Sequence, residues 1–213
     1  MAGKLVKWYH VHKRDLPWRH QERWPQAPYA VWVSEIMLQQ TRVATVIDYF
    51  TRWMAKWPTV ELLAAATEEE VNEMWSGLGY YRRARMLHQG AKTVVDTYKG
   101  RLPSTVDELK GIPGIGAYTA GAISSIAFGN KEPLVDGNVV RVLSRLFALG
   151  DDPKAPASVK VHWDLARALV KESGDPAALN QGLRFHVHAC SLRVHVRLMR
   201  EVVPVYMRMY SRT

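Results

Sequence analysis

Cysteine is almost absent from this sequence: Cys190 is the only one in 213 residues. A single cysteine excludes an internal disulfide framework, a four-cysteine zinc site and an iron–sulfur cluster held by four thiolates of one chain. Long apolar runs are absent too, since no uninterrupted stretch approaches the ~18 residues that a membrane helix needs. The opening residues, MAGKLVKWYHVHKRD, lack the apolar core of a secretory signal. We therefore expect no association with a membrane.

Negative charge is also scarce, because 20 Asp and Glu face 29 Lys and Arg, which leaves a net charge of +9. The excess is uneven. Residues 182–213 hold six arginines, one glutamate and no lysine, a net charge of +5, whereas residues 1–181 carry only +4. A basic balance permits nucleic-acid binding without establishing it. We therefore divide the chain into a mildly basic body, 1–181, and a divergent basic tail, 182–213.

Strand-like alternation is lacking in the body, where apolar residues recur at helical spacing, so the predicted fold class is all-α. The nearly continuous apolar run over residues 29–40 predicts a buried helix. Thr67 and the three glutamates after it form a capping box that opens another helix. A long helix is predicted over residues 80–98, ended by Gly100 and Pro103.

The segment GIPGIG, residues 111–116, separates two predicted helices within the unit 109–123. Glycines at alternate positions with a proline predict a tight turn. Backbone N–H groups left uncovered at the following helix start suit a phosphate. A plain interhelical turn with glycine caps fits the spacing equally well. The small residues that follow, AYTAGAI, favour DNA because they allow a backbone to approach closely.

Two carboxylates have different surroundings. Glu35 lies inside the apolar run VWVSEIMLQQ with no Lys or Arg four residues away; a carboxyl group in such surroundings can hold a proton near neutrality, as a general acid must. A surface glutamate on a half-buried helix is the alternative. Asp136, in VDGN, is predicted to be an N-cap. Held by helix N–H groups, it stays ionised and suits a developing cation.

Aromatic and amide side chains are weaker signals. Tyr80 and Tyr81 follow a Gly-Leu-Gly turn and precede the basic run RRAR. A ring beside such a run can stack on a base while the arginines contact phosphates. The alternative is a core tyrosine on a helix with a solvated basic face, and we favour it for Tyr81. Gln39 and Gln40 could bond to base edges or cap backbone carbonyls.

An ordered set of motifs resembles a known family. The motifs are DLPWR (15–19), WVSEIMLQQTRV (32–43), GLGYYRRAR (77–85), LKGIPGIGAYTAGAI (109–123), VDGNVVRVLSR (135–145) and LNQ (179–181). Together they are similar to the adenine DNA glycosylases of the MutY type, helix-hairpin-helix relatives of endonuclease III. The resemblance implies two helical lobes with the active site between them.

The resemblance also implies a reaction, the removal of adenine mispaired with 8-oxoguanine or guanine after the base is flipped out. Glu35 matches the acid that protonates adenine at N7, and Asp136 the carboxylate that stabilises the sugar cation. Tyr118 and Asn138 match residues that position these groups. Lyases of the superfamily have a nucleophilic lysine where Tyr118 stands, so a monofunctional enzyme is expected.

The DNA-binding residues implied by the resemblance fall into three groups. Gln40 and Tyr80, with Thr41 beside them, match residues that probe or wedge the 8-oxoguanine side. The adenine pocket would be lined by Arg19, Trp18 and Gln39, and the phosphate-binding hairpin would use Gly114 and Gly116.

The family's cofactor is a [4Fe–4S] cluster, but Cys190 is the only one of four possible ligands, so this chain supports no cofactor. The histidines show no metal spacing, and no metal site is expected. The expected partner is double-stranded DNA with an A·8-oxoguanine or A·G mispair, bound by a monomer. The sequence is compatible with a protein of the nucleus, of the mitochondrion or of the bacterial cytoplasm.

The rival hypothesis for the function is a catalytically impaired DNA-binding fragment or isoform. A third hypothesis, a helical protein-interaction module, would leave Glu35 and Asp136 unexplained.

Overall fold

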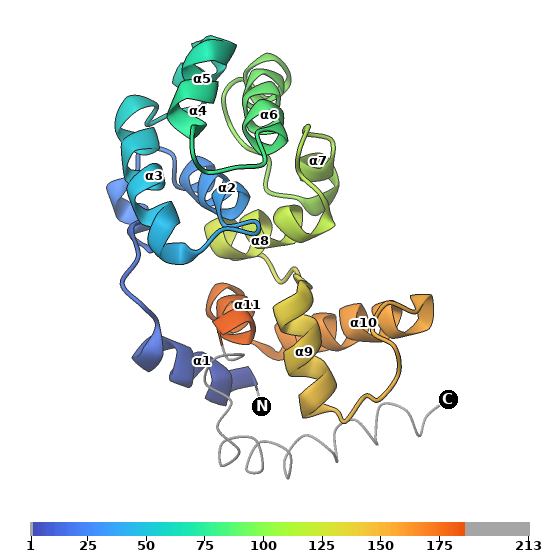
Figure 1. The fold of residues 1–213 in the computed structure, drawn as a ribbon. Helices are drawn as coiled ribbons and strands as arrows, with labels where there is room; N and C mark the ends of the chain where they lie inside the picture. The colour runs from blue at the N-terminus through green and yellow to red at the C-terminus, as the bar shows by residue number, and fades with distance from the viewer. Residues whose placement is uncertain (1, 186–213) are drawn as a thin grey trace. The chain divides into compact units, whose positions relative to one another are not determined.

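Helices are the only regular elements in the part of the chain that the structure, a computed structural model, describes, residues 2–185 (Figure 1). The all-α prediction is therefore confirmed over that range. The described chain divides into two compact units, residues 14–128 and the combination of residues 2–13 with residues 129–185. No helix among the described residues is both long and apolar enough to cross a membrane. Residues 186–213, with Cys190 and most of the basic tail, lie outside this range.

The first unit, residues 14–128, is built around α2 (Ala27–Met37), which is buried along almost its whole length and packs against α3 and α8 (Figure 1). Trp53 of α3 donates a hydrogen bond from Nε1 to the hydroxyl of Tyr29 at 3.0 Å, inside an aromatic core that also contains Phe50 and Trp75. Burial of these large apolar side chains stabilises the unit. Its elements are η1 (Pro17–Arg19), η2 (Gln21–Arg23), α2, α3 (Val43–Lys56), α4 (Val60–Ala65), α5 (Glu68–Trp75), α6 (Arg82–Tyr98), α7 (Val106–Lys110) and α8 (Ala117–Phe128).

Several local predictions are confirmed in this unit. The capping box of α5 is present, because the Thr67 side chain accepts from the Glu70 N–H at 3.2 Å and Glu70 accepts from the Thr67 N–H at 3.0 Å. The hairpin is also present, with α7 and α8 flanking the glycine-rich turn.

Two predicted helix ends are wrong. The helix predicted over 29–40 ends at Met37, and the one predicted to begin at Tyr80 begins at Arg82. The reason is backbone conformation: Gln40 has φ of 55° and Tyr80 has φ of 48°, in the left-handed region that a right-handed helix excludes. Tyr81, expected in the core, is 43% exposed.

The second unit contains α1 (Ala2–His12), α9 (Gly137–Leu146), α10 (Pro156–Glu172) and α11 (Pro176–Phe185), with α11 in contact with the other three. Sequence reasoning did not predict α11, which continues past Gln181 into the segment assigned to the tail. Gly182 packs directly on α1, since a Cβ added there would lie 3.3 Å from Leu5 and 3.4 Å from Tyr9. Tyr9 also donates to Gln181 Oε1 at 2.8 Å.

Candidate active site and nucleic-acid interface

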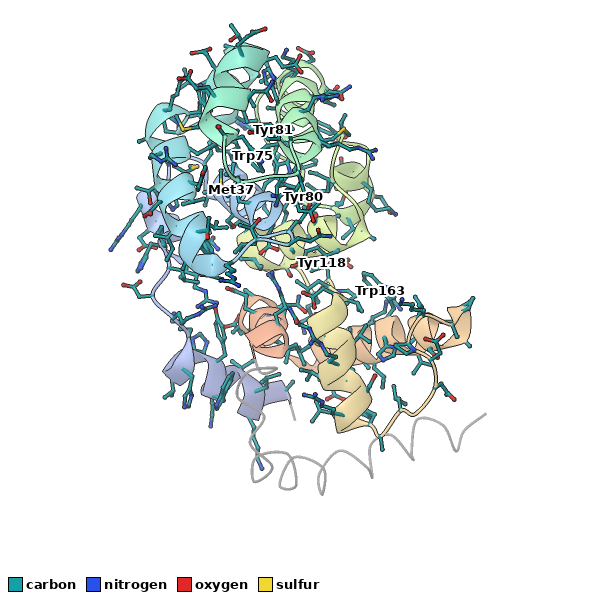
Figure 2. All side chains as sticks on the ribbon, viewed as in Figure 1. Met37, Trp75, Tyr80, Tyr81, Tyr118 and Trp163 are labelled. Carbon is teal, nitrogen blue, oxygen red and sulfur yellow. The ribbon has the colours of Figure 1, made fainter. Side chains whose placement is uncertain are left out.

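Glu35 and Tyr118 are brought together by the packing of α2 on α8. Glu35 is 4% exposed, and its Oε2 accepts a hydrogen bond of 2.7 Å from the Tyr118 hydroxyl. Tyr118, labelled in Figure 2, is only partly buried. The arrangement joins a carboxyl group at the edge of the core to a phenol that reaches the surface. It can exchange a proton with a group bound beside it.

Small residues allow the helices around this pair to approach closely. The buried part of α8 runs from Thr119 to Ser125 and consists of small side chains apart from Ile123. On α6, a Cβ at Gly90 would lie 2.8 Å from both the Pro113 carbonyl oxygen and the Trp32 ring. Gly90 therefore lets the hairpin turn and α2 pack against α6.

The hairpin turn places Gly114 and Gly116 differently. Gly114 has φ of +83°, and a Cβ there would lie 2.9 Å from the Met86 Cβ, so both conformation and space favour glycine. Gly116 is exposed, with nothing within 4 Å of a Cβ, and directly precedes the first turn of α8. Its surroundings leave room for a phosphate at the N–H groups of that turn.

A cavity of about 350 Å³ lies where α2 ends and α6 begins. We call it the Gln40–Tyr80 pocket; its lining residues are Ile36, Gln39, Gln40, Tyr80, Arg82, Arg83, Met86 and Gly114. Tyr80, labelled in Figure 2, is 65% exposed. The structure thus brings together three predicted DNA-binding residues, Gln39, Gln40 and Tyr80, with Gly114 of the hairpin.

Thr41, Arg19 and Trp18 lie outside that lining. Thr41 Oγ1 donates to the Gln39 carbonyl at 3.2 Å and so adjoins the pocket. Trp18 is 7% exposed and packs edge-to-face on Phe50 with ring centroids 5.4 Å apart, which makes it a core residue. Arg19 donates to the Arg14 carbonyl at 2.7 Å.

Arg83 is a pocket residue whose contacts sequence reasoning missed. The basic run RRAR, residues 82–85, was interpreted as phosphate-binding arginines or as a solvated helix face. No local sequence pattern distinguishes Arg83 from the other arginines of this run. Its guanidinium is partly buried and donates to acceptors on two separate segments, residues 36–41 and residues 78–79. The acceptors are the carbonyls of Ile36 and Met37 (3.1 Å each), Gln39, Leu78 (3.2 Å) and Gly79 (3.1 Å), and Thr41 Oγ1 (3.2 Å).

Asp136 and Asn138 belong to the second unit. Asp136 is the N-cap of α9 as predicted, with Oδ1 accepting from the Asn138 and Val139 N–H groups at 2.8 Å each. Oδ2 lies 3.5 Å from Asn138 Nδ2 and 3.5 Å from Nε of Arg184 in α11. The two oxygens are thus distinct: the helix start holds one, while an amide and a guanidinium flank the other. Sequence reasoning missed Arg184 because it assigned that position to the tail.

The donor set does not fit the family's iron–sulfur cluster. Four thiolates are needed, whereas the only cysteine, Cys190, lies outside the described residues. Within residues 2–185, no group of three or more His, Cys, Asp or Glu side chains could hold a metal ion.

Known proteins match this chain in sequence. A model described as HhH-GPD superfamily base excision DNA repair protein matches residues 33–168. The adenine DNA glycosylase of Rattus norvegicus is 53% identical over 182 residues, which are 83% of this chain and 35% of the relative. That of Arabidopsis thaliana is 49% identical over 201 residues, covering 84% of this chain and 32% of the relative. The chain therefore spans about a third of the length of these relatives.

Solved structures match it in fold. A thermostable thymine-DNA glycosylase aligns with a TM-score of 0.76 and 27% identity over 87% of this chain and 83% of its own. A trapped covalent intermediate of endonuclease III with DNA aligns with a TM-score of 0.68 over 87% of this chain and 82% of its own; at 24% identity it shows the fold alone. The helix-hairpin-helix glycosylase fold expected from the motifs is confirmed.

Proposed function

Because the chain belongs to the HhH-GPD superfamily of base excision DNA repair proteins, we propose that it is a DNA glycosylase that removes adenine mispaired with 8-oxoguanine or guanine. The observation that carries the proposal is the hydrogen bond of 2.7 Å between the Tyr118 hydroxyl and the buried Glu35 carboxyl. Relatives at 53% and 49% identity are named adenine DNA glycosylases, which supports adenine as the excised base.

Glu35 acts as the general acid in this proposal. Adenine leaves deoxyribose poorly as an anion, so the base must be protonated before or as the N-glycosidic bond breaks. Oε2 of Glu35 accepts a hydrogen bond from the Tyr118 hydroxyl, and the carboxyl group delivers the proton to the base. Tyr118 fixes the rotamer of the carboxyl group and so aims that proton at N7 of the flipped base.

Asp136 stabilises the sugar cation that remains. Its Oδ1 is held by two helix N–H groups at 2.8 Å, so the carboxylate is oriented before the reaction. Oδ2 is the oxygen offered to C1′, and Asn138 Nδ2 at 3.5 Å restrains it. Preorganised negative charge opposite a developing cation is the largest contribution such a site can make.

DNA is bound through the hairpin and the Gln40–Tyr80 pocket. Phosphate binds at the open N–H groups beside Gly116. Gln40, Tyr80 and the neighbouring Thr41 contact the base opposite the extruded adenine, since flipping leaves a gap that a wedge must fill. Arg19 and Gln39 contact the adenine side, supported from the core by Trp18. Tyr118 is not a Schiff-base nucleophile, so the enzyme removes the base without cleaving the strand.

A single-turnover assay tests the function. Full-length protein is mixed with duplexes that contain A·8-oxoguanine, A·G or A·T, and free adenine and strand scission are measured separately. We expect adenine release from the first two duplexes, none from A·T, and no scission before alkali treatment. Absence of release from every duplex would contradict the proposal.

One observation favours a second candidate, a DNA-binding form with impaired catalysis. The guanidinium of Arg184 lies 3.5 Å from Asp136 Oδ2, where it competes with the sugar cation for the same negative charge. Such a protein would bind the mispaired duplex as tightly as an active enzyme and would release little adenine. The same assay, paired with a binding titration, separates the two.

A further inference from the structure

Arg83 holds together two segments that are not otherwise bonded to each other by any described hydrogen bond. One is the end of α2, whose last carbonyls have no partner within the helix. The other is the turn before α6. The guanidinium reaches both, and its centre lies 5.3 Å from the Trp75 ring centroid and 5.4 Å from that of Tyr80. It is therefore enclosed by carbonyls at its edges and by aromatic rings at its faces.

The positions of its acceptors are the decisive observation. Arg83 donates to the carbonyl of Gln39 and, at 3.1 Å, to that of Gly79. These two carbonyls belong to the peptide groups that directly precede Gln40 and Tyr80, the residues with φ of 55° and 48°. Because φ describes rotation next to the preceding peptide group, one guanidinium restrains both left-handed residues.

Left-handed conformations are strained for non-glycine residues and persist only where the surroundings impose them. Among residues 2–185, the Gln39 carbonyl accepts from one other side chain, the hydroxyl of Thr41. The Gly79 carbonyl also accepts from Nε1 of Trp75 at 2.9 Å. Arg83 alone bonds to both. No carboxylate in the described part of the chain pairs with it, so its hydrogen bonds serve the backbone.

We propose that Arg83 is a positioning residue that holds Gln40 and Tyr80 in their left-handed conformations and thereby sets how strictly the pocket discriminates the base opposite the adenine. This rests on the proposed function, because the opposite base is read by Gln40 and Tyr80 only if the protein is an adenine glycosylase. Arg83 touches no reacting atom. It acts by fixing the directions in which two side chains leave the backbone.

The first test is the Arg83→Lys variant of the full chain. Lysine keeps the positive charge but has a single ammonium nitrogen in place of the two terminal nitrogens of the guanidinium. It therefore cannot bond to residues 36–41 and residues 78–79 at the same time. We expect the ratio of A·8-oxoguanine to A·G excision rates to fall about tenfold, since hydrogen bonds to the partly buried carbonyls of Gln39 and Gly79 are lost. The control is Arg85→Lys, an exposed neighbour on the same helix paired with Glu68 at 3.7 Å, which should leave the ratio unchanged.

The second readout does not depend on activity. Fluorotyrosine placed at position 80 should give one sharp ¹⁹F resonance in the parent protein and a shifted or split resonance in Arg83→Lys. An unchanged excision ratio or an unchanged resonance would overturn the proposal. If the parent protein releases no adenine at all, the proposed function fails, while the ¹⁹F spectrum still decides whether Arg83 positions Tyr80.

A milder variant covers the case in which Arg83→Lys does not fold. Thr41→Val removes the hydroxyl that accepts from both terminal nitrogens of Arg83 at 3.2 Å and preserves the shape of the side chain. Because Thr41 is itself proposed to contact the opposite base, the ¹⁹F resonance is the deciding readout for this variant, and we expect a smaller shift than in Arg83→Lys together with a smaller fall in the excision ratio. A parent-like resonance would overturn the proposal.

Discussion

The hydroxyl of Tyr118 donates a 2.7 Å hydrogen bond to Oε2 of Glu35 across the interface between α8 and α2. The pair is separated by 83 positions in the chain, and the small side chains of α8 let the two helices approach. One oxygen of the carboxyl group is therefore occupied by a protein donor.

Replacing Glu35 by glutamine should abolish adenine excision and preserve DNA binding. The amide is nearly isosteric but cannot deliver a proton, and loss of a general acid costs ~10²–10⁴-fold in rate. The measurement is the single-turnover rate on an A·8-oxoguanine duplex together with the dissociation constant. Glu73→Gln, an exposed change on α5 of the same unit, is the matched control. Excision by Glu35→Gln at near the parent rate would refute the assignment.

Tyr118→Lys should add strand-cleaving activity. The lysine amine would stand where lyases of the superfamily carry their nucleophile and could form a Schiff base with the sugar. Borohydride trapping with an A·8-oxoguanine duplex should give a covalent adduct with this variant and none with the parent protein. Tyr81→Lys places a lysine at an exposed tyrosine of the same unit and should give none. An adduct with the parent protein would indicate another nucleophilic lysine.

Arg184→Gln should accelerate excision. The guanidinium 3.5 Å from Asp136 Oδ2 offsets part of the negative charge that the sugar cation needs. Both side chains are about one-fifth exposed (22% and 23%), so solvent screening limits the effect. We expect a gain of about five-fold, equivalent to ~1 kcal/mol. Arg167→Gln, which breaks an exposed pair with Asp164 in α10, serves as the control. A slower Arg184→Gln would instead mean that Arg184 orients Asp136 productively.

The parts of the fold that were predictable depend on local chemistry. The capping box at Thr67, the N-cap at Asp136 and the glycines of the hairpin each bond or turn within a few residues, so their patterns can be recognised in the sequence alone. The left-handed residues Gln40 and Tyr80 are different. Their conformations depend on the guanidinium of Arg83, which lies 44 positions from Gln39 in the chain. A contact between such distant segments leaves no periodic pattern in the sequence.

The residues of the candidate site also differ in how far local sequence reveals them. Glu35 stood out because it interrupts an apolar run, but its partner Tyr118 was assigned through the family resemblance and not through spacing. Arg184 was missed because a change in composition after Gln181 suggested that the body ended there. The backbone continues α11 to Phe185 because Gly182 fits closely against α1. Packing against α1 carries the helix past Gln181, and composition did not reveal this contact.

The last prediction concerns pH and stability. His88 of α6 is 4% exposed, and its Nε2 has no hydrogen-bond partner. Burial lowers the pKa of His88 below its ordinary value of 6.5, with nearby Lys92 adding to the shift, while contacts with the Ala66 and Ala64 backbone and the charge of Glu68 oppose it. The folded state therefore binds a proton less readily than the unfolded state, so stability is fully present above pH 6.5 and decreases as the pH falls towards the folded-state pKa.

Replacing His88 by glutamine should remove this contribution. In denaturant titrations between about pH 7.5 and 5, a group that protonates only on unfolding adds up to ~1.4 kcal/mol per pH unit to the slope of the unfolding free energy. We expect the parent protein to lose stability more steeply than His88→Gln on acidification, whatever the difference between them at pH 7.5. His12→Gln, at an exposed position of α1, should retain the parent slope. Equal slopes for the parent and His88→Gln would show that the buried imidazole gains its proton without unfolding.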